Sequence, residues 1–327
     1  MTKEESKMMQ GVAILIMIFY HLFNPHDAVE YTGTVLGHVA MAHNPVPFFV
    51  LLSGYGMYTL YVSRGSKKSK FSRCLSLYLR YWIVLTFFLF LSRCMGDYRC
   101  DLSLIPLVTN YFGVSSTYYL PSWFILPYCI LVFISTYVFK IVDKLGVAKT
   151  LLLSYAIYVV TAYLTRFPLF QSNAFQVFYI FFPFCLGALL AKTNFVEKVD
   201  LFLKRYPTVF IIFLLALAIV IRCLVYSGAI LSIYAAIIIT LFVVVLRRYN
   251  KCDTFLMYLG KASLGMWMIH AWICWYLFRD WVYGLGNSFL MFVFVSIVSY
   301  IIVIIFDYIL LFFKIFNKIN LSWLKRN

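Results

Sequence analysis

Charged residues are scarce in this chain of 327 residues, and acidic ones especially so. Only 12% of the residues are charged, and 12 aspartates and glutamates stand against 28 lysines and arginines. A soluble domain carries about a quarter of its residues as charged side chains, whereas 64% of this chain is hydrophobic. A water-soluble globule of this length has too little interior to hide so much apolar surface. The composition therefore excludes an ordinary soluble protein and predicts segments dissolved in lipid.

Several signatures of other protein classes are also missing. There is no CxxC pair or His/Cys cluster that would indicate a zinc site. His26, His38 and His43 share a loop with acidic residues, but their spacing defines no metal site, so we expect no bound metal. No internal repeat of the kind found in many transporters is visible. Cys94 and Cys100 share one loop, and spacing alone leaves a disulfide between them open.

Ten apolar runs have the length expected of membrane-spanning helices. They cover residues 8–24, 45–62, 77–92, 120–139, 149–165, 174–191, 207–226, 228–246, 258–278 and 288–313. Lipid offers no partner to open backbone groups, so each run should be helical. No cleavage site follows the first run, which we expect to be retained. We predict an all-α, polytopic transmembrane helical bundle of about ten helices, forming a single domain over residues 1–327.

The positions of lysine and arginine orient these spans. Cytoplasmic segments of membrane proteins are enriched in both residues. With ten spans, both termini and alternate connections hold all but five of the 28 lysines and arginines. The five on the opposite side are Arg93, Arg99, Arg166, Arg222 and Arg279. This pattern predicts cytoplasmic termini and explains the net charge of +16, so we expect no nucleic-acid partner.

Ionisable side chains inside apolar runs are costly, which makes each of them a functional candidate. His21 closes the first run, QGVAILIMIFYHLF, and histidine can act as a general base near neutral pH. Asp27 and Glu30 follow in the next loop, where a carboxylate could orient the imidazole. His270 lies inside the ninth run, where a structural, hydrogen-bonding histidine is an equally good interpretation.

Two further stretches have both a structural and a functional interpretation. Ser53 lies in VPFFVLLSGYGMY, where small residues serve helix packing, and a serine nucleophile would need a base. The basic loop SRGSKKSKFSRC, Ser63 to Cys74, fits a cytoplasmic topology signal or a docking site for a phosphorylated donor or anionic lipid headgroups. Arg80 could extend to the membrane interface, and Asp307 could pair with a neighbouring helix.

These pieces together resemble the acyltransferase 3 family of bacterial integral membrane acyltransferases, over nearly the whole chain. GVAILIMIFYH is similar to the family's first-helix signature, which ends in a functional histidine, here His21. Four later fragments are similar to family elements in the same order: FFVLLSGY (Phe48 to Tyr55), PSWFILPY with Trp123, FPFCLGALLA (Phe182 to Ala191), and LGKASLGMWMIH ending at His270.

The sequence departs from the family pattern near the expected donor site. Many members carry arginine where this chain has Gln10, and many have an RxxR pair entering the third helix. Arg73 matches the first arginine of that pair, and Ser76 replaces the second. The nearby basic residues that could substitute electrostatically are Lys68, Lys70 and Arg80. These changes leave donor affinity and donor identity open.

The resemblance implies transfer of an acyl group, usually acetyl, from cytosolic acyl-CoA to a hydroxyl of a cell-surface or lipid-linked glycan. It implies a bacterial inner-membrane enzyme with acyl-CoA as substrate and no tightly bound cofactor. His21 would be the base for the acceptor hydroxyl or a transient acyl carrier. The residues expected to support it are His270, Asp27, Glu30, Ser53 and Trp123, and those expected to bind the donor are Arg73, Arg80, Lys68, Lys70 and Gln10. The alternative is a non-enzymatic transporter of a lipid-linked glycan or small solute, since proton relays also use intramembrane histidine and aspartate.

Overall fold

The computed structural model describes residues 1–64, 70–225, 228, 230–249 and 253–324. Helix makes up 83% of the structure, and no strand occurs in the part of the chain that is described. The predicted all-α fold is confirmed.

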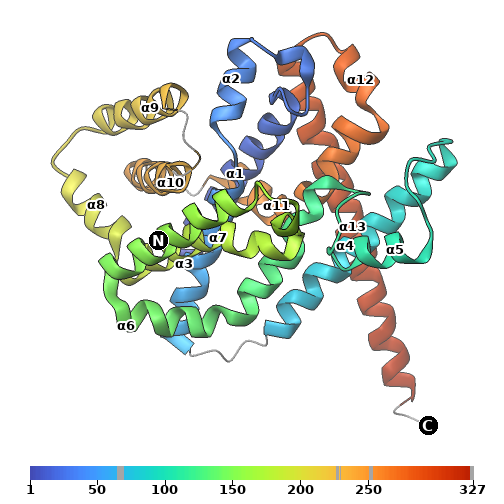
Figure 1. Cartoon of the computed structure of the whole chain (residues 1–327), viewed down its shortest axis with the longest axis horizontal. Helices are drawn as coiled ribbons and strands as arrows, with labels where there is room; N and C mark the ends of the chain where they lie inside the picture. Colours follow the sequence, from blue (N-terminus) through green and yellow to red (C-terminus); the bar gives the residue numbers. More distant parts are fainter. Residues whose placement is uncertain (65–69, 226–227, 229, 250–252, 325–327) are drawn as a thin grey trace.

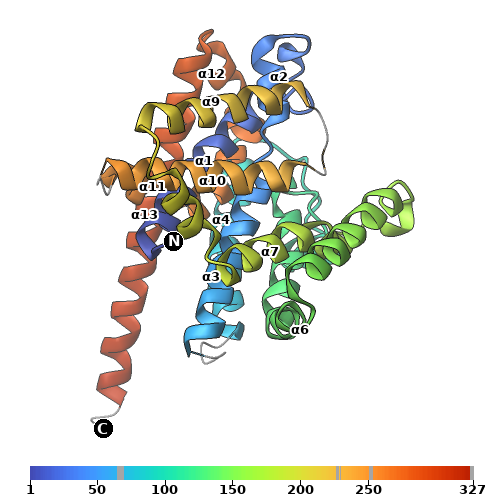
Figure 2. The same ribbon diagram turned by 90° about the vertical axis from the view of Figure 1, so that its left-hand side faces the viewer.

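The α-helices in chain order are α1 (Lys3–Phe23), α2 (Val35–Ala42), α3 (Val46–Arg64), α4 (Lys70–Cys94), α5 (Leu104–Tyr111), α6 (Ile125–Leu164), α7 (Gln176–Lys192), α8 (Phe195–Leu203), α9 (Thr208–Leu224), α10 (Leu231–Arg248), α11 (Thr254–Ala271), α12 (Arg279–Gly284) and α13 (Ser288–Leu324). Short 3-10 turns are η1 (Val29–Tyr31), η2 (Leu120–Phe124), η3 (Pro168–Phe170) and η4 (Asn173–Phe175), and η5 (Trp272–Leu277) is a π-helix. Figure 1 shows α2 and α12 at the same end of the molecule, and Figure 2 shows α9 and α10 side by side.

Seven helical stretches of the described residues are long and apolar enough to cross a membrane. They are Lys3–Phe23, Val35–Ser63, Lys70–Cys94, Leu120–Leu164, Asn173–Lys192, Leu231–Arg248 and Ser288–Leu310. Their number and length fit a multi-pass membrane protein.

The expected count of ten spans differs from these seven in three places. The fourth and fifth expected spans fall in one run because α6 continues through both, interrupted only by Gly146 at φ 73° and ψ −176°; Figure 1 shows α6 changing direction. α9 has only 17 residues. α11 covers most of the ninth expected span but is less apolar, since it includes Lys261, Ser263 and His270. Ten spans and cytoplasmic termini therefore stay predictions.

Glycines set the closest helix contacts in the bundle. A Cβ placed on Gly260 of α11 would lie 1.9 Å from the carbonyl oxygen of Lys7 in α1, and one on Gly11 would lie 2.3 Å from that of Leu256. Such small residues let two helix backbones approach directly. α1 and α11 therefore cross tightly where Gly11 meets Gly260.

An aromatic stack fills the core at the C-terminal end of α11. Trp272 lies between Phe88 of α4 and Tyr119, with ring centroids 5.2 Å and 5.4 Å away and nearly parallel planes. The Tyr119 hydroxyl also donates to the Trp267 carbonyl at 2.5 Å. Because all three rings are buried, they fix the end of α11 against α4 and against the segment that precedes α6.

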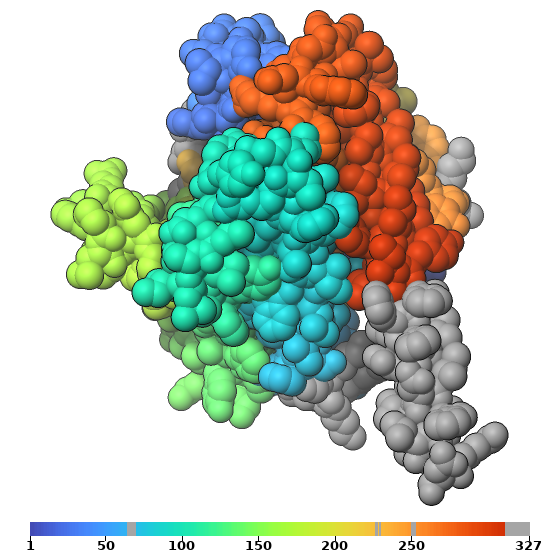
Figure 3. Space-filling model, turned by 90° about the vertical axis from the view of Figure 1, so that its right-hand side faces the viewer, coloured from blue at the N-terminus to red at the C-terminus, as the bar shows by residue number. Residues whose placement is uncertain are grey.

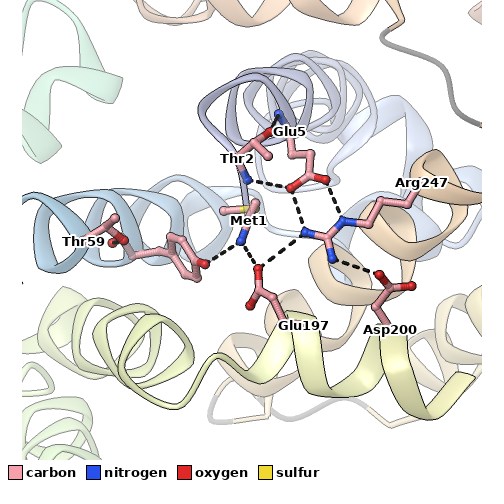
Figure 4. A network of polar contacts seen from close by, with 8 residues as sticks. Met1, Thr2, Glu5, Thr59, Glu197, Asp200 and Arg247 are labelled. Atoms are coloured by element: carbon pink, nitrogen blue, oxygen red, sulfur yellow. Dashed lines mark hydrogen bonds and ion pairs between the residues drawn. The ribbon is translucent and has the colours of Figure 1, made fainter. Parts of the chain in front are cut away.

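A network of ion pairs ties the start of α1 to α8 and α10 (Figure 4). Arg247 of α10 donates to Glu5 at 2.6 Å, to Asp200 at 3.1 Å and to Glu197 at 3.4 Å. The amino group of Met1 contacts Glu197 as well. Three carboxylates around one guanidinium form a network, which holds geometry better than an isolated surface pair does. This end of α1 is therefore anchored independently of its histidine end.

Candidate active site

The loop after α1 folds back over His21. The backbone N–H groups of Asp27 and Ala28 donate to the Asn24 carbonyl at 2.9 Å and 2.8 Å, which closes a tight turn. Asp27 Oδ2 then lies 3.2 Å from His21 Nδ1 and accepts a hydrogen bond from Asn24 Nδ2 at 3.2 Å. Both the His21 and Asp27 side chains are 15% exposed, so the pair is largely shielded from solvent.

This geometry selects the tautomer of His21. An ionised carboxylate only accepts hydrogen bonds, so the His21 nitrogen that faces Asp27 carries the proton. The other nitrogen, Nε2, then has a free lone pair and can accept a proton. A carboxylate behind Nδ1 and a basic Nε2 in front is the arrangement that general-base histidines use.

His270 lies beside His21 as a second imidazole. The two ring centroids are 5.1 Å apart, with their planes inclined at 33°, and the side chain of His270 is fully buried. His270 Nδ1 is 3.0 Å from the Met266 carbonyl, which fixes the proton on Nδ1. Its Nε2 is buried and has no hydrogen-bond partner among the described residues. Such an unpartnered buried nitrogen is rare in folded proteins.

Equal spacing along two packed helices that run in the same direction explains why these histidines meet. Gly11 of α1 packs on Gly260 of α11, and His21 and His270 each follow ten residues later. Ten helical residues span about 15 Å, so both histidines reach the same level. The equal spacing is visible in the sequence, but only the contact between α1 and α11 shows that it brings the two histidines together.

Trp275 completes the histidine pair from the π-helix η5. Its ring lies edge-on to His21 with centroids 4.4 Å apart, and its Nε1 donates to the His21 carbonyl at 2.9 Å. Single π-turns are frequent at functional sites because they turn side chains out of the ordinary helical register. Sequence reasoning missed Trp275, since nothing in the run AWICWYL distinguishes it from its aromatic neighbours.

Glu30 lies beside this site but does not touch His21. It pairs with Arg279 of α12 at 2.7 Å, and Arg279 Nη1 also donates to the Asp27 carbonyl at 3.2 Å. The hydroxyl of Tyr283, also in α12, donates to the Leu22 carbonyl at 2.9 Å. α12 thus clamps the loop that carries Asp27. The charge pattern of the sequence predicted Arg279 on the outer side, but it did not predict these contacts with Glu30 and Asp27.

Ser53 and Trp123 belong to a separate aromatic cluster. Ser53 Oγ donates to the Tyr128 hydroxyl at 3.3 Å, and Tyr128 stacks on Phe124 with centroids 5.5 Å apart. Phe124 also contacts Trp123 at 5.7 Å and Trp267 at 5.9 Å. The structure therefore joins Ser53 with Trp123 through shared neighbours, but among the described contacts neither side chain meets His21.

The residues expected to bind the donor are dispersed in the structure. Gln10 accepts a hydrogen bond from Lys7 within α1 at 2.8 Å, and Lys70 donates to the Phe133 carbonyl at 2.7 Å. Arg80 pairs with Asp307 of α13 at 2.7 Å, so the neighbouring-helix interpretation of Asp307 is confirmed.

Arg73 and Lys68 differ from these three. Arg73 lies in the first turn of α4 and forms no ion pair with any residue that the structure describes. Lys68 lies outside the described residues. Among the described basic side chains of residues 70–80, Arg73 is the one that neither pairs with a carboxylate nor donates to a backbone carbonyl.

Within residues 1–64, 70–225, 228, 230–249 and 253–324, no three His, Cys, Asp or Glu side chains are grouped so that they could hold a metal ion. Cys94 and Cys100 are both free thiols in the structure.

The chain matches a model of a known protein family. A family model described as an acyltransferase domain covers residues 5–308 of the chain, from the first turn of α1 into α13. No curated protein matches, and no solved structure matches either.

Proposed function

This chain belongs to the acyltransferase 3 family, whose model covers almost all of it, and we propose that it moves an acetyl group from cytosolic acetyl-CoA to a glycan hydroxyl. The acceptor would be a cell-surface or lipid-linked glycan, and the membrane the bacterial inner membrane. The observation that carries the proposal is the contact between His21 Nδ1 and Asp27 at 3.2 Å, which leaves Nε2 basic at the end of α1.

The proposed reaction uses that nitrogen twice. His21 Nε2 takes the proton of the acceptor hydroxyl while the oxygen attacks the thioester carbonyl carbon. The carbon–sulfur bond then breaks, and the sulfur leaves with the proton held by His21, giving an ester and free CoA thiol. Asp27 holds the imidazole in place and balances its positive charge during the reaction. In a variant of this scheme, the same nitrogen is transiently acylated. Trapping of an acyl-histidine would identify this variant.

The donor would bind at the start of α4, which the proposed topology places in the cytoplasm together with both termini. A helix N-terminus attracts phosphate groups through its free N–H groups and its dipole. Arg73 adds a guanidinium that can hold phosphate oxygens in pairs. Arg80 contributes less in this scheme, because Asp307 already neutralises it.

Arg73→Ala should raise the KM for acetyl-CoA about tenfold or more and leave kcat nearly unchanged. A hydrogen bond to a charged group contributes about 1.5–3 kcal/mol, and 1.4 kcal/mol corresponds to a factor of ten in binding. An interaction equally strong in ground and transition states changes KM alone. Steady-state kinetics on membranes with equal protein amounts measure this change.

Arg205→Ala is the matched control, because Arg205 is an exposed arginine on another connection predicted to be cytoplasmic. It should keep the wild-type KM. If Arg73→Ala also keeps that KM, the basic segment before α4 acts only as a topology signal.

Asp27→Asn should lower kcat about 10–100-fold with little change in the KM for acetyl-CoA. The loss corresponds to one charge-assisted hydrogen bond of about 1.5–3 kcal/mol. The asparagine amide can donate to Nδ1, and it then favours the tautomer whose Nε2 is protonated and no longer basic. A purely structural role for Asp27 would instead reduce the amount of folded protein at unchanged kcat.

Glu30→Gln provides the comparison for Asp27→Asn. Glu30 stands three residues later in the same loop but pairs with Arg279 rather than with His21. Its kcat should stay close to that of the wild type. Equal losses of kcat in the two variants would show that the loop, not the carboxylate behind His21, is responsible.

Release of free thiol from acetyl-CoA tests the function itself. Inverted membrane vesicles containing the protein should release thiol only when they also hold unacylated glycan, and sealed right-side-out vesicles should release none from added acetyl-CoA. Mass spectrometry of surface glycans from cells with and without the protein should find the added acetyl group. Unchanged glycans and no thiol release would instead favour a transporter.

A further inference from the structure

A polar hollow opens between two loops near the His21 site. Its volume is about 520 Å³, within the range of about 300–1,000 Å³ that small-molecule sites occupy. Val114 and Leu120 add apolar surface to its lining. Its polar side chains come from the segment before α6 and the segment before α7: Ser115, Ser116, Thr117, Gln171, Ser172 and Asn173. Figure 3 shows the yellow-green segment around residue 170 projecting at the left, beside the green-to-teal one.

Hydrogen bonds hold the hollow in shape. Asn173 Nδ2 donates to the Gly113 carbonyl at 3.0 Å and so links the two loops. The fully buried Asn110 donates to Thr117 Oγ1 at 2.9 Å and accepts from the Tyr118 N–H at 3.0 Å. A preformed site binds a ligand without first having to order itself.

The π-helix η5 lies between the hollow and the histidine pair. Tyr276 lines it, and its hydroxyl accepts a hydrogen bond from the Leu120 N–H at 3.0 Å. The preceding residue, Trp275, lies 4.4 Å from His21 and 6.4 Å from Tyr276, ring centroid to ring centroid. Consecutive residues of one π-helix therefore contact His21 on one side and the hollow on the other.

Among the residues that the structure describes, no charged side chain lines this hollow. Arg99 lies beside the hollow and donates to the Tyr276 carbonyl at 2.9 Å. Arg99 also binds both carboxylate oxygens of Asp97 at 2.8 Å and 2.7 Å. These side-chain hydrogen bonds lower the pKa of Asp97 to about 2, so the pair is fully formed and neutral overall at neutral pH. An anionic ligand would find no unpaired cation among the lining residues.

We propose that this hollow binds an uncharged sugar unit of the acceptor glycan, adjacent to the unit whose hydroxyl is acylated at His21. Hydroxyl and amide side chains both donate and accept hydrogen bonds, which matches the hydroxyls of a sugar. Tyr276 offers an aromatic surface to the C–H face of the ring. The hydroxyl and amide side chains that line the hollow beside Val114 and Leu120 favour a sugar over an acyl chain. The assignment rests on the proposed acyl transfer and adds the acceptor's position and chemical class.

Filling the hollow tests this assignment. The probe is the unacylated surface glycan extracted from cells that lack the protein, and its binding to the purified protein in nanodiscs is measured by saturation-transfer NMR without acetyl-CoA. Ser116→Trp should abolish this binding and should raise the glycan concentration for half-maximal transfer at least tenfold. The KM for acetyl-CoA should not change. Ser172→Trp, on the opposite loop, should act in the same way.

Leu169→Trp is the control, because Leu169 is 83% exposed in the same segment as Ser172 but does not line the hollow. It should bind glycan and transfer acetyl groups like the wild type. Wild-type glycan binding by both Ser116→Trp and Ser172→Trp would overturn the assignment, as would a glycan built only of acidic sugars. A third outcome separates the two proposals. If the two tryptophan variants lose glycan binding but the wild type transfers no acetyl group, the binding site is supported and the proposed acyl transfer is wrong.

Discussion

His21→Ala is expected to lower kcat for acetyl transfer about 10²–10⁴-fold, the range that a positioned general base contributes. The reason is local: Asp27 fixes the proton on Nδ1, so Nε2 is the nitrogen available to take the acceptor proton. His21→Gln keeps a polar side chain of similar reach but has no basic nitrogen, and it should lose as much. Transfer to extracted glycan, by membranes holding equal amounts of each variant, measures the effect.

His270→Ala is the comparison within the same site. His270 is buried and its Nδ1 is already engaged with the Met266 carbonyl, so we expect a smaller loss of kcat than for His21→Ala. Near-normal transfer by His21→Ala would remove His21 both as base and as acyl carrier. The family membership would then describe the fold of this chain and leave its chemistry to other residues.

Gly260→Ala is expected to cause a large loss of stability. The new Cβ would lie 1.9 Å from the Lys7 carbonyl oxygen and 2.7 Å from its carbon, and both are backbone atoms that no rotamer change can move aside. Overpacking a tight contact typically costs about 1–3 kcal/mol, and a backbone clash falls at or above that range. α1 would have to move away from α11, which separates His21 from His270.

Gly56→Ala is the matched control, since Gly56 also lies within a helix but a Cβ there meets nothing within 4 Å. Alanine in a helix is favoured over glycine by up to about 1 kcal/mol, so this variant should be as stable as the wild type or slightly more so. Thermal unfolding in detergent, followed by size-exclusion chromatography, measures both variants. Equal melting temperatures for Gly260→Ala and Gly56→Ala would show that α1 and α11 do not cross at Gly260.

Hydropathy along the chain determined the class of this protein and the approximate positions of its helices. Lipid-facing backbone has to satisfy its hydrogen bonds within each segment, so an apolar run of span length predicts a helix without knowledge of its neighbours. The number of spans did not follow in the same way. α6 passes through two expected spans with one interruption at Gly146, and α11 carries polar residues that lower its hydropathy because it packs inside the bundle, where Gly265 meets Val303 of α13.

The sequence by itself also singled out His21 and, in the adjoining loop, both Asp27 and Glu30, because a carboxylate there is within reach of the helix end. Which carboxylate faces the imidazole was decided by the turn at Asn24 and by Arg279, which engages Glu30 instead. Contacts between residues more than a hundred positions apart bring three further features to the site: His270, Trp275 and the hollow beside Tyr276. The hydropathy of a segment determines whether it is stable as a helix in lipid, but only packing between helices determines which of their polar side chains meet.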